Sequence, residues 1–226
     1  MVDGAALEKR SPRKRSVGSN PTLSAGLKDE YKMRKPDFAD LLAENPKIKY
    51  GCAKDILAFA KENPAGIYPD LKFFIKLLDN ENKILRWTAI DLIGALARVD
   101  NAKEVDKLIN RLFGLLHTGN MITANHAINA LADIASAEPE YQEEITEELL
   151  KVESYDYDTA ECRNICIGKV ILAIGKYFDN LEDKEATLEF AKRQTKNTRN
   201  ATRKKAEKFL TKYKSKNLLN TVKLKK

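Results

Sequence analysis

Cysteine is scarce in this sequence, with three residues in a chain of 226. Three cysteines cannot form a disulfide framework, and so few are typical of a protein in a reducing compartment. Long apolar runs are also missing: none approaches the roughly 18 residues that a membrane-spanning helix needs. The first 20 residues lack the apolar stretch of a secretory signal peptide. We therefore expect an intracellular protein with no membrane contact, cytoplasmic or, in a eukaryote, nuclear.

The sequence motifs of common enzyme classes are missing as well. It contains no phosphate-cradling glycine loop, no Gly-x-Ser-x-Gly elbow and no zinc-protease helix. Cys162 and Cys166 share one face of a predicted helix, but no second cysteine pair or neighbouring histidine accompanies them, as a zinc site would require. We expect no metal, no cofactor and a non-enzymatic role.

Charge is present in quantity and is unevenly distributed. Residues 1–35 contain nine basic and four acidic residues, residues 36–191 contain 17 basic and 28 acidic, and residues 192–226 contain 14 basic and one acidic. Basic ends of this density attract phosphates or acidic protein surfaces. A tail that only keeps the protein soluble explains the same composition, so both interpretations stay open.

Composition also divides the chain into three parts. Residues 1–34 are rich in serine, glycine and charge and have few large apolar residues, so we expect a disordered basic tail. The basic cluster at residues 9–15 fits a nuclear import signal, a phosphate-binding arm, a solvated tail or a segment added for expression. Residues 35–215 are expected to form one helical domain, and residues 216–226 a second basic tail.

Within the expected domain, the apolar spacing is helical almost throughout, and short polar breaks divide it into about ten helices. A quartet of apolar residues recurs five times at intervals of 36 to 40 residues. The quartets are Ala53, Ile56, Leu57, Ala60; Ala89, Leu92, Ile93, Leu96; Ala127, Ala130, Leu131, Ile134; Ile167, Val170, Ile171, Ile174; and Ala206, Phe209, Leu210, Tyr213. A two-helix hairpin cannot bury its apolar face alone, so we expect successive hairpins to stack around one elongated core. Small residues such as Gly94 would let neighbouring helices approach closely.

Residues 77–97 are the most informative stretch. They comprise a first helix ending in leucines, a turn that starts with Asp79, and a second helix with Arg86 and an Ile-Gly-Ala-Leu-Ala ending. This stretch resembles the HEAT repeat of the armadillo-type folds. The resemblance implies an all-α, right-handed α-solenoid of about five two-helix repeats, in which the second helix of each repeat lines the concave surface. Such a scaffold hosts many unrelated functions, so it implies no activity.

The repeat alignment places three residues of each second helix on one face, at spacings i, i+4 and i+7. In chain order these are Asp55, Phe59, Glu62; Asp91, Ala95, Arg98; Asn129, Asp133, Ser136; Lys169, Ala173, Lys176; and Lys208, Lys212, Ser215. Their charge changes from negative in the first repeat to positive in the last, although an ordinary solvated stripe would also be charged.

We therefore expect the C-terminal repeats to bind an anionic partner, either the phosphate backbone of a nucleic acid or an acidic protein segment. The sequence does not indicate the oligomeric state. The candidate anion-binding residues are Lys169, Lys176, Arg199, Arg203, Lys204, Lys208 and Lys212.

One enzyme alternative rests on Trp87 and Asp91, which form a Trp-x-x-x-Asp motif on a helix. This motif is similar to that of the HEAT-like DNA glycosylases that remove alkylated bases. The resemblance implies that Asp91 stabilises the cation developing at the sugar and that Trp87 contacts the damaged nucleotide. This chain departs from the family in having His126 where an arginine is usual and no second tryptophan. The structural alternative is that Trp87 packs between repeats and that Asp91 faces solvent.

Overall fold

The computed structural model describes the backbone of residues 34–223 and the side chains of residues 34–213. Every regular element in this range is helical, and no strand occurs in it. The α-helices are α1 (Pro46–Glu62), α2 (Pro64–Ile67), α3 (Leu71–Leu77), α4 (Lys83–Leu96), α5 (Ile109–Leu116), α6 (Met121–Ala137), α7 (Gln142–Leu150), α8 (Ala160–Ile174), α9 (Glu185–Gln194) and α10 (Asn200–Lys223). Short 3₁₀ turns, such as Phe38–Leu42, extend or precede several of them. The expectation of an all-α protein is confirmed.

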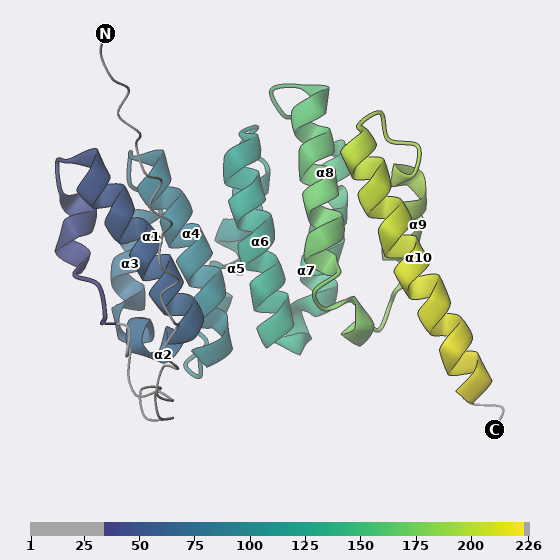
Figure 1. Cartoon of the computed structure of the whole chain (residues 1–226), viewed down its shortest axis with the longest axis horizontal. Coiled ribbons are helices and arrows are strands. Elements are labelled where there is room, and N and C mark those ends of the chain that lie inside the picture. The colour runs from purple at the N-terminus through teal and green to yellow at the C-terminus, as the bar shows by residue number, and fades with distance from the viewer. Residues whose placement is uncertain (1–33, 224–226) are drawn as a thin grey trace, which may run out of the picture. The chain divides into compact units, whose positions relative to one another are not determined.

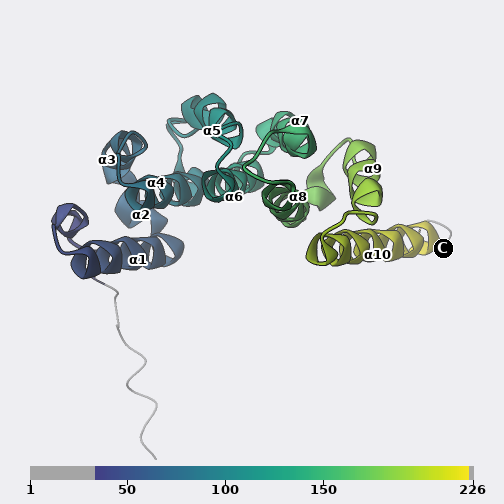
Figure 2. The same cartoon turned by 90° about the horizontal axis from the view of Figure 1, so that it is seen from above.

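The described helices pack in two layers (Figure 2). In one layer, α1 packs on α4, α4 on α6, α6 on α8 and α8 on α10, and Figure 1 shows these long helices side by side. In the other, α3, α5, α7 and α9 each pack on the long helix that follows in the chain. We call the first the second-helix layer, and its side turned away from α3, α5, α7 and α9 the open face. Among residues 34–223, no helix combines the length and apolarity needed to cross a membrane.

Polar N-caps set the residues at which the helices of the second-helix layer begin. The side chain of Asn45 accepts a hydrogen bond from the backbone N–H of Lys47, and Asn82 and Asn120 cap α4 and α6 in the same way. Thr159 caps α8. A cap satisfies backbone N–H groups that have no partner inside the helix, which is why asparagine and threonine favour this position. Similar breaks in the sequence therefore start helices at similar points of successive hairpins.

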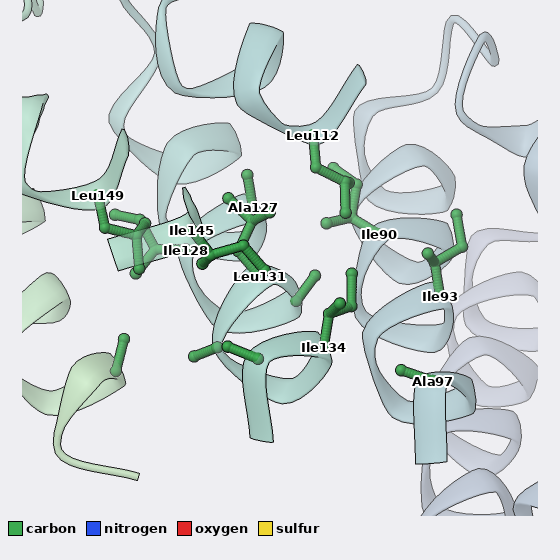
Figure 3. Close-up of a cluster of buried hydrophobic side chains, with 14 of the residues drawn as sticks. Ile90, Ile93, Ala97, Leu112, Ala127, Ile128, Leu131, Ile134, Ile145 and Leu149 are labelled. Carbon is green, nitrogen blue, oxygen red and sulfur yellow. The ribbon is translucent and has the colours of Figure 1, made fainter. Parts of the chain in front are cut away.

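The apolar quartets form the core that joins these helices. All of their members are buried except Leu57, which is partly buried against the same core. Figure 3 shows side chains of α6, including Ile128 and Leu131, lying between those of α4, such as Ile90, and those of α7, such as Ile145. Burial of such side chains is the main favourable term in folding, so the sequence repeat marks the residues that hold neighbouring hairpins together.

Close backbone approach and polar contacts add to this core. A Cβ atom placed on Gly94 would lie 2.5 Å from the Cα atom of Ala130, so α4 and α6 are in contact where Gly94 has no side chain. The indole N–H of Trp87 donates a 3.0 Å hydrogen bond to the hydroxyl of Thr123, which also links α4 to α6. Thr202 on α10 donates to the carbonyl oxygen of Asn164 on α8 at 2.7 Å.

The structure describes only one of the two ends of the chain for which a tail is expected. The basic cluster at 9–15 and the rest of residues 1–33 lie outside the described residues. At the other end, α10 continues to Lys223, through most of the segment that was expected as a tail (216–226).

Candidate functional site

The open face carries a groove of about 670 Å³. All of its lining residues belong to the second-helix layer or to the turns that follow these helices, so the groove crosses α1, α4 and α6 and reaches the end of α8. They are Leu57, Lys61, Asp91, Gly94, Ala95, Arg98, Asn129, Asp133, Ser136, Ala137 and Lys176. The predicted face of α4 and the predicted face of α6 therefore both line it.

On two other helices, one residue of the predicted row does not reach the open face. Phe59 on α1 is buried in the core, and Leu57 and Lys61 line the groove in its place. Ala173 on α8 is buried as well. On α1 the groove is lined by residues other than Phe59, and on α8 the buried Ala173 interrupts the row, so the i, i+4, i+7 row does not run unbroken along the open face. Ser215 lies outside the described side chains.

Several charged groups of the groove are held by other groups of the protein. The ammonium of Lys176 lies 2.6 Å from a carboxylate oxygen of Asp133, across the junction between α6 and α8. The guanidinium of Arg98 donates to the backbone carbonyl oxygens of Ala60 (3.1 Å) and Lys61, which lie at the end of α1. Arg98 thus satisfies carbonyl groups that the helix leaves unpaired. The groove is lined by three basic and two acidic residues, so both signs of charge are present in it.

Trp87, Asp91 and His126 come together at the edge of this groove. Nδ1 of His126 lies 2.8 Å from a carboxylate oxygen of Asp91. The indole of Trp87 stacks on the His126 ring, with centroids 5.5 Å apart and planes inclined by 9°. One face of the indole is therefore covered by a side chain of the protein, and the Asp91 carboxylate already has a hydrogen-bond partner. All three residues stand out in the sequence. The separation of 35 residues between Asp91 and His126 is close to the spacing of the quartets, and only that spacing indicates that the two could meet.

A group of lysines lies further along the layer, on α8, in the turn that follows α8, and on α10. We call Lys169, Lys176 and Lys205 the lysine cluster. Burial lowers the pKa of Lys169 below its ordinary value, and the nearby charge of Lys176 lowers it further. The carboxylates of Asp91 and Asp133 act in the opposite direction, so Lys169 lies between the acids of the groove and the base-rich α10.

Lys205 extends the cluster from α8 to α10. Its ammonium nitrogen lies 3.3 Å from the position that a Cβ atom on Gly168 would occupy, so its side chain lies over α8. Burial lowers its pKa, and the charges of Arg199 and Lys169 add to this effect. Burial is the larger cause, because it disfavours the charged form, and the like charges act in the same direction. Lys205 was not among the predicted binding residues, and only its place next to Lys169 identifies it.

The remaining predicted binding residues fall into two groups. Arg199, Arg203 and Lys212 make internal contacts: Arg199 lies 2.7 Å from Glu161, Arg203 donates to two backbone carbonyls before α10, and Lys212 donates to the hydroxyl of Tyr213 at 2.9 Å. Lys204 and Lys208 are exposed one turn apart on α10. The structure therefore places Lys169 near Lys176 on one side and Lys205 on the other, and leaves Lys204 and Lys208 as exposed charges on the adjacent helix.

The described residues contain no group of three or more His, Cys, Asp or Glu side chains arranged to hold a metal ion. Cys166 is buried, and burial raises the pKa of its thiol to about 11, although a hydrogen bond from Tyr157 acts against this. A thiol that stays protonated at neutral pH is a poor nucleophile and metal ligand.

By class, the described part of the chain is an all-helical protein with a groove on one face and a lysine cluster beside it. No family model matches the chain, and no curated protein matches it. Among solved structures, the chain is similar to the crystal structure of an engineered protein from the Northeast Structural Genomics Consortium, with 18% identity and a TM-score of 0.48. The similarity covers 78% of this chain and 77% of that one.

Proposed function

We propose that this chain is a HEAT-type α-solenoid that works as a binding module, and that it engages an anionic partner through α8 and α10. Three features support the solenoid: the recurring quartets are buried, successive long helices pack on one another, and the shorter helices form a separate layer. One observation carries the binding role. The Lys205 side chain of α10 lies over Gly168 of α8, next to Lys169, and the charge of Lys169 helps to lower the pKa of Lys205.

Like charges held near one another cost stability in the free protein. Asp133 and Asp91 offset part of that cost for Lys176 and Lys169, and a bound anion would offset the remainder. Lys204 and Lys208 extend the positive region along α10, one turn apart on its exposed surface. The partner class that fits is a polyanion, either the phosphate backbone of a nucleic acid or an acidic protein segment. With nucleic acid, each lysine that neutralises a phosphate releases a counterion, so binding must weaken as salt rises.

The test is the charge reversal of Lys204→Glu with Lys208→Glu, measured with two labelled probes, a 20-base-pair duplex DNA and a glutamate-rich peptide. We expect the affinity for whichever probe binds to fall at least tenfold at 50 mM salt, because two attractive charges become repulsive. The plot of log K against log salt for DNA should also become less steep, since each lost phosphate contact changes that slope by about 0.9.

The matched control is Lys72→Glu with Lys76→Glu, two exposed lysines at the same spacing on α3, in the opposite layer. It changes the net charge of the protein by the same amount. Unchanged binding in the α10 variant, or an equal loss in the α3 variant, would refute a binding site on α8 and α10.

A second candidate function is the removal of alkylated bases, and the contact between Asp91, His126 and Trp87 at the groove favours it. In this reading Asp91 stabilises the positive charge at the sugar, and His126 positions its carboxylate. Asp91→Asn keeps the size of the side chain and removes its charge, so it should lower the release of methylated base from DNA at least tenfold. Release measured by chromatography at the same rate in both proteins, or in neither, argues for the binding module alone.

A further inference from the structure

Aliphatic side chains are exposed on the same face as the groove and the lysine cluster. Ile84 on α4 and Ile122 on α6 have exposed fractions of 38% and 42%, and they stand 38 residues apart, at equivalent places in two repeats. Each precedes a groove residue by seven positions, Asp91 and Asn129, and therefore lies on the same side of its helix. Exposed apolar side chains gathered on one face are typical of a surface that a partner covers.

Leu172 on α8 is the exposed aliphatic residue that lies nearest in sequence to Lys169 and Lys176. It is 53% exposed, although most apolar residues of α8 are buried. It follows Lys169 by three positions, so these two lie on one side of α8, and Lys176 stands in the turn just after the helix. Leu172 also lies one helical turn after Gly168, over which the Lys205 side chain of α10 lies, so an exposed aliphatic side chain stands beside the lysine cluster.

This combination fits a protein segment better than a nucleic acid. A phosphate backbone gains nothing from Leu172 or the two isoleucines, and it would meet the carboxylates of Asp91 and Asp133 in the groove. Bases could stack on exposed rings, but His126 covers one face of Trp87. A segment with both carboxylates and large apolar side chains satisfies both kinds of group, because its acids pair with the lysines while its apolar side chains bury the aliphatic ones.

We propose that the open face binds an acidic segment of a partner protein that also carries large apolar residues, with Leu172 as the apolar anchor beside the lysine cluster. This inference rests on the proposed anion-binding function and names its partner. The N-terminal residues of the chain itself do not have the required charge, because residues 1–35 contain nine basic and only four acidic residues.

The experiment uses the full chain and three probes. The amphipathic peptide has 20 residues, with glutamates and with leucine or phenylalanine at every third or fourth position. The serine peptide has serine in place of these apolar residues, and the third probe is a 20-base-pair duplex DNA. Binding is measured by fluorescence anisotropy at 150 mM salt. We expect the amphipathic peptide to bind at least tenfold more tightly than the serine peptide and the duplex.

Leu172→Gln should then remove most of the difference between the two peptides, a loss of about fivefold to tenfold for the amphipathic one, and leave the serine peptide unchanged. Leu42→Gln is the control, because Leu42 is 60% exposed on the turn before α1, away from the lysine cluster. Loss of the difference in both variants would indicate a non-specific effect and would overturn the role of Leu172.

The outcomes separate the two proposals. If both peptides bind equally or the duplex binds most tightly, and Lys204→Glu with Lys208→Glu weakens binding, the anion-binding function stands and the protein-segment inference is wrong. If the charge reversal has no effect on any probe, or if none of the three binds, the anion-binding function is wrong and the inference fails with it.

Discussion

Gly94→Ala should lower the free energy of unfolding by about 2 kcal/mol, the cost of forcing an extra methyl group into a closely packed interface. The added Cβ atom would lie 2.5 Å from the Cα and 2.9 Å from the Cβ of Ala130. Neither atom is the end of a flexible side chain, so α4 and α6 must move apart. Such a shift would loosen the buried quartets of both helices, including Leu92 and Leu131.

For two other helical glycines, the same substitution should raise the free energy of unfolding, and these variants are the controls. Gly51 on α1 and Gly114 on α5 also lie inside helices, but a Cβ atom on either would meet nothing within 4 Å. Alanine is preferred over glycine in a helix by about 1 kcal/mol, so Gly51→Ala and Gly114→Ala should each stabilise the protein by up to that amount. Urea unfolding followed by circular dichroism measures all three variants. A Gly94→Ala protein as stable as the two controls would show that α4 and α6 do not touch at this point.

The buried positions of the long helices could be predicted from the sequence because they follow the periodicity of its apolar residues. An amphipathic helix must bury its apolar positions, and five quartets at a near-constant spacing fix which side of each long helix faces the core. Caps such as Asn45, Asn82 and Asn120 are similarly local, since they depend on a side chain and the next few backbone N–H groups. Fold class and helix order therefore follow from short-range rules.

The exposed faces were harder to predict, because a small rotation of a helix changes which residues meet solvent. Leu57 is less buried and Phe59 more buried than the alignment suggests, which shows that α1 is turned relative to α4. Spacing also cannot tell which lysines have partners within the fold. Lys176 pairs with Asp133, 43 residues away, and Arg199 with Glu161, 38 residues away. Each of these pairs forms only when one hairpin packs against the next. The predicted binding residues therefore include several whose charge is paired within the fold.

Phe209→Ala should lower the free energy of unfolding of the C-terminal hairpin by about 3 to 5 kcal/mol, the usual cost of removing a buried phenylalanine ring. Phe209 is buried in a cluster with Phe178 and Tyr213, with ring centroids 4.9 Å and 4.7 Å away. Phe178 follows α8 and the other two rings lie on α10, so this cluster holds the last long helix in the layer. Without Phe209, α10 loses a buried aromatic ring that packs on Phe178, and we expect the helix to open locally before the remainder unfolds.

Limited trypsin digestion measures that local opening, because α10 contains cleavable residues such as Lys204 and Lys208. Cleavage within α10 should become at least tenfold faster in Phe209→Ala, while cleavage within α1 and α4, after residues such as Lys54 and Arg86, keeps its original rate. Phe209→Leu is the matched control, since it keeps an apolar side chain in the cluster and should cost about 1 to 1.5 kcal/mol. Equal protection of α10 in Phe209→Ala and the parent protein would mean that the aromatic cluster does not anchor this helix. The lysine cluster that spans α8 and α10 would then need another source of rigidity.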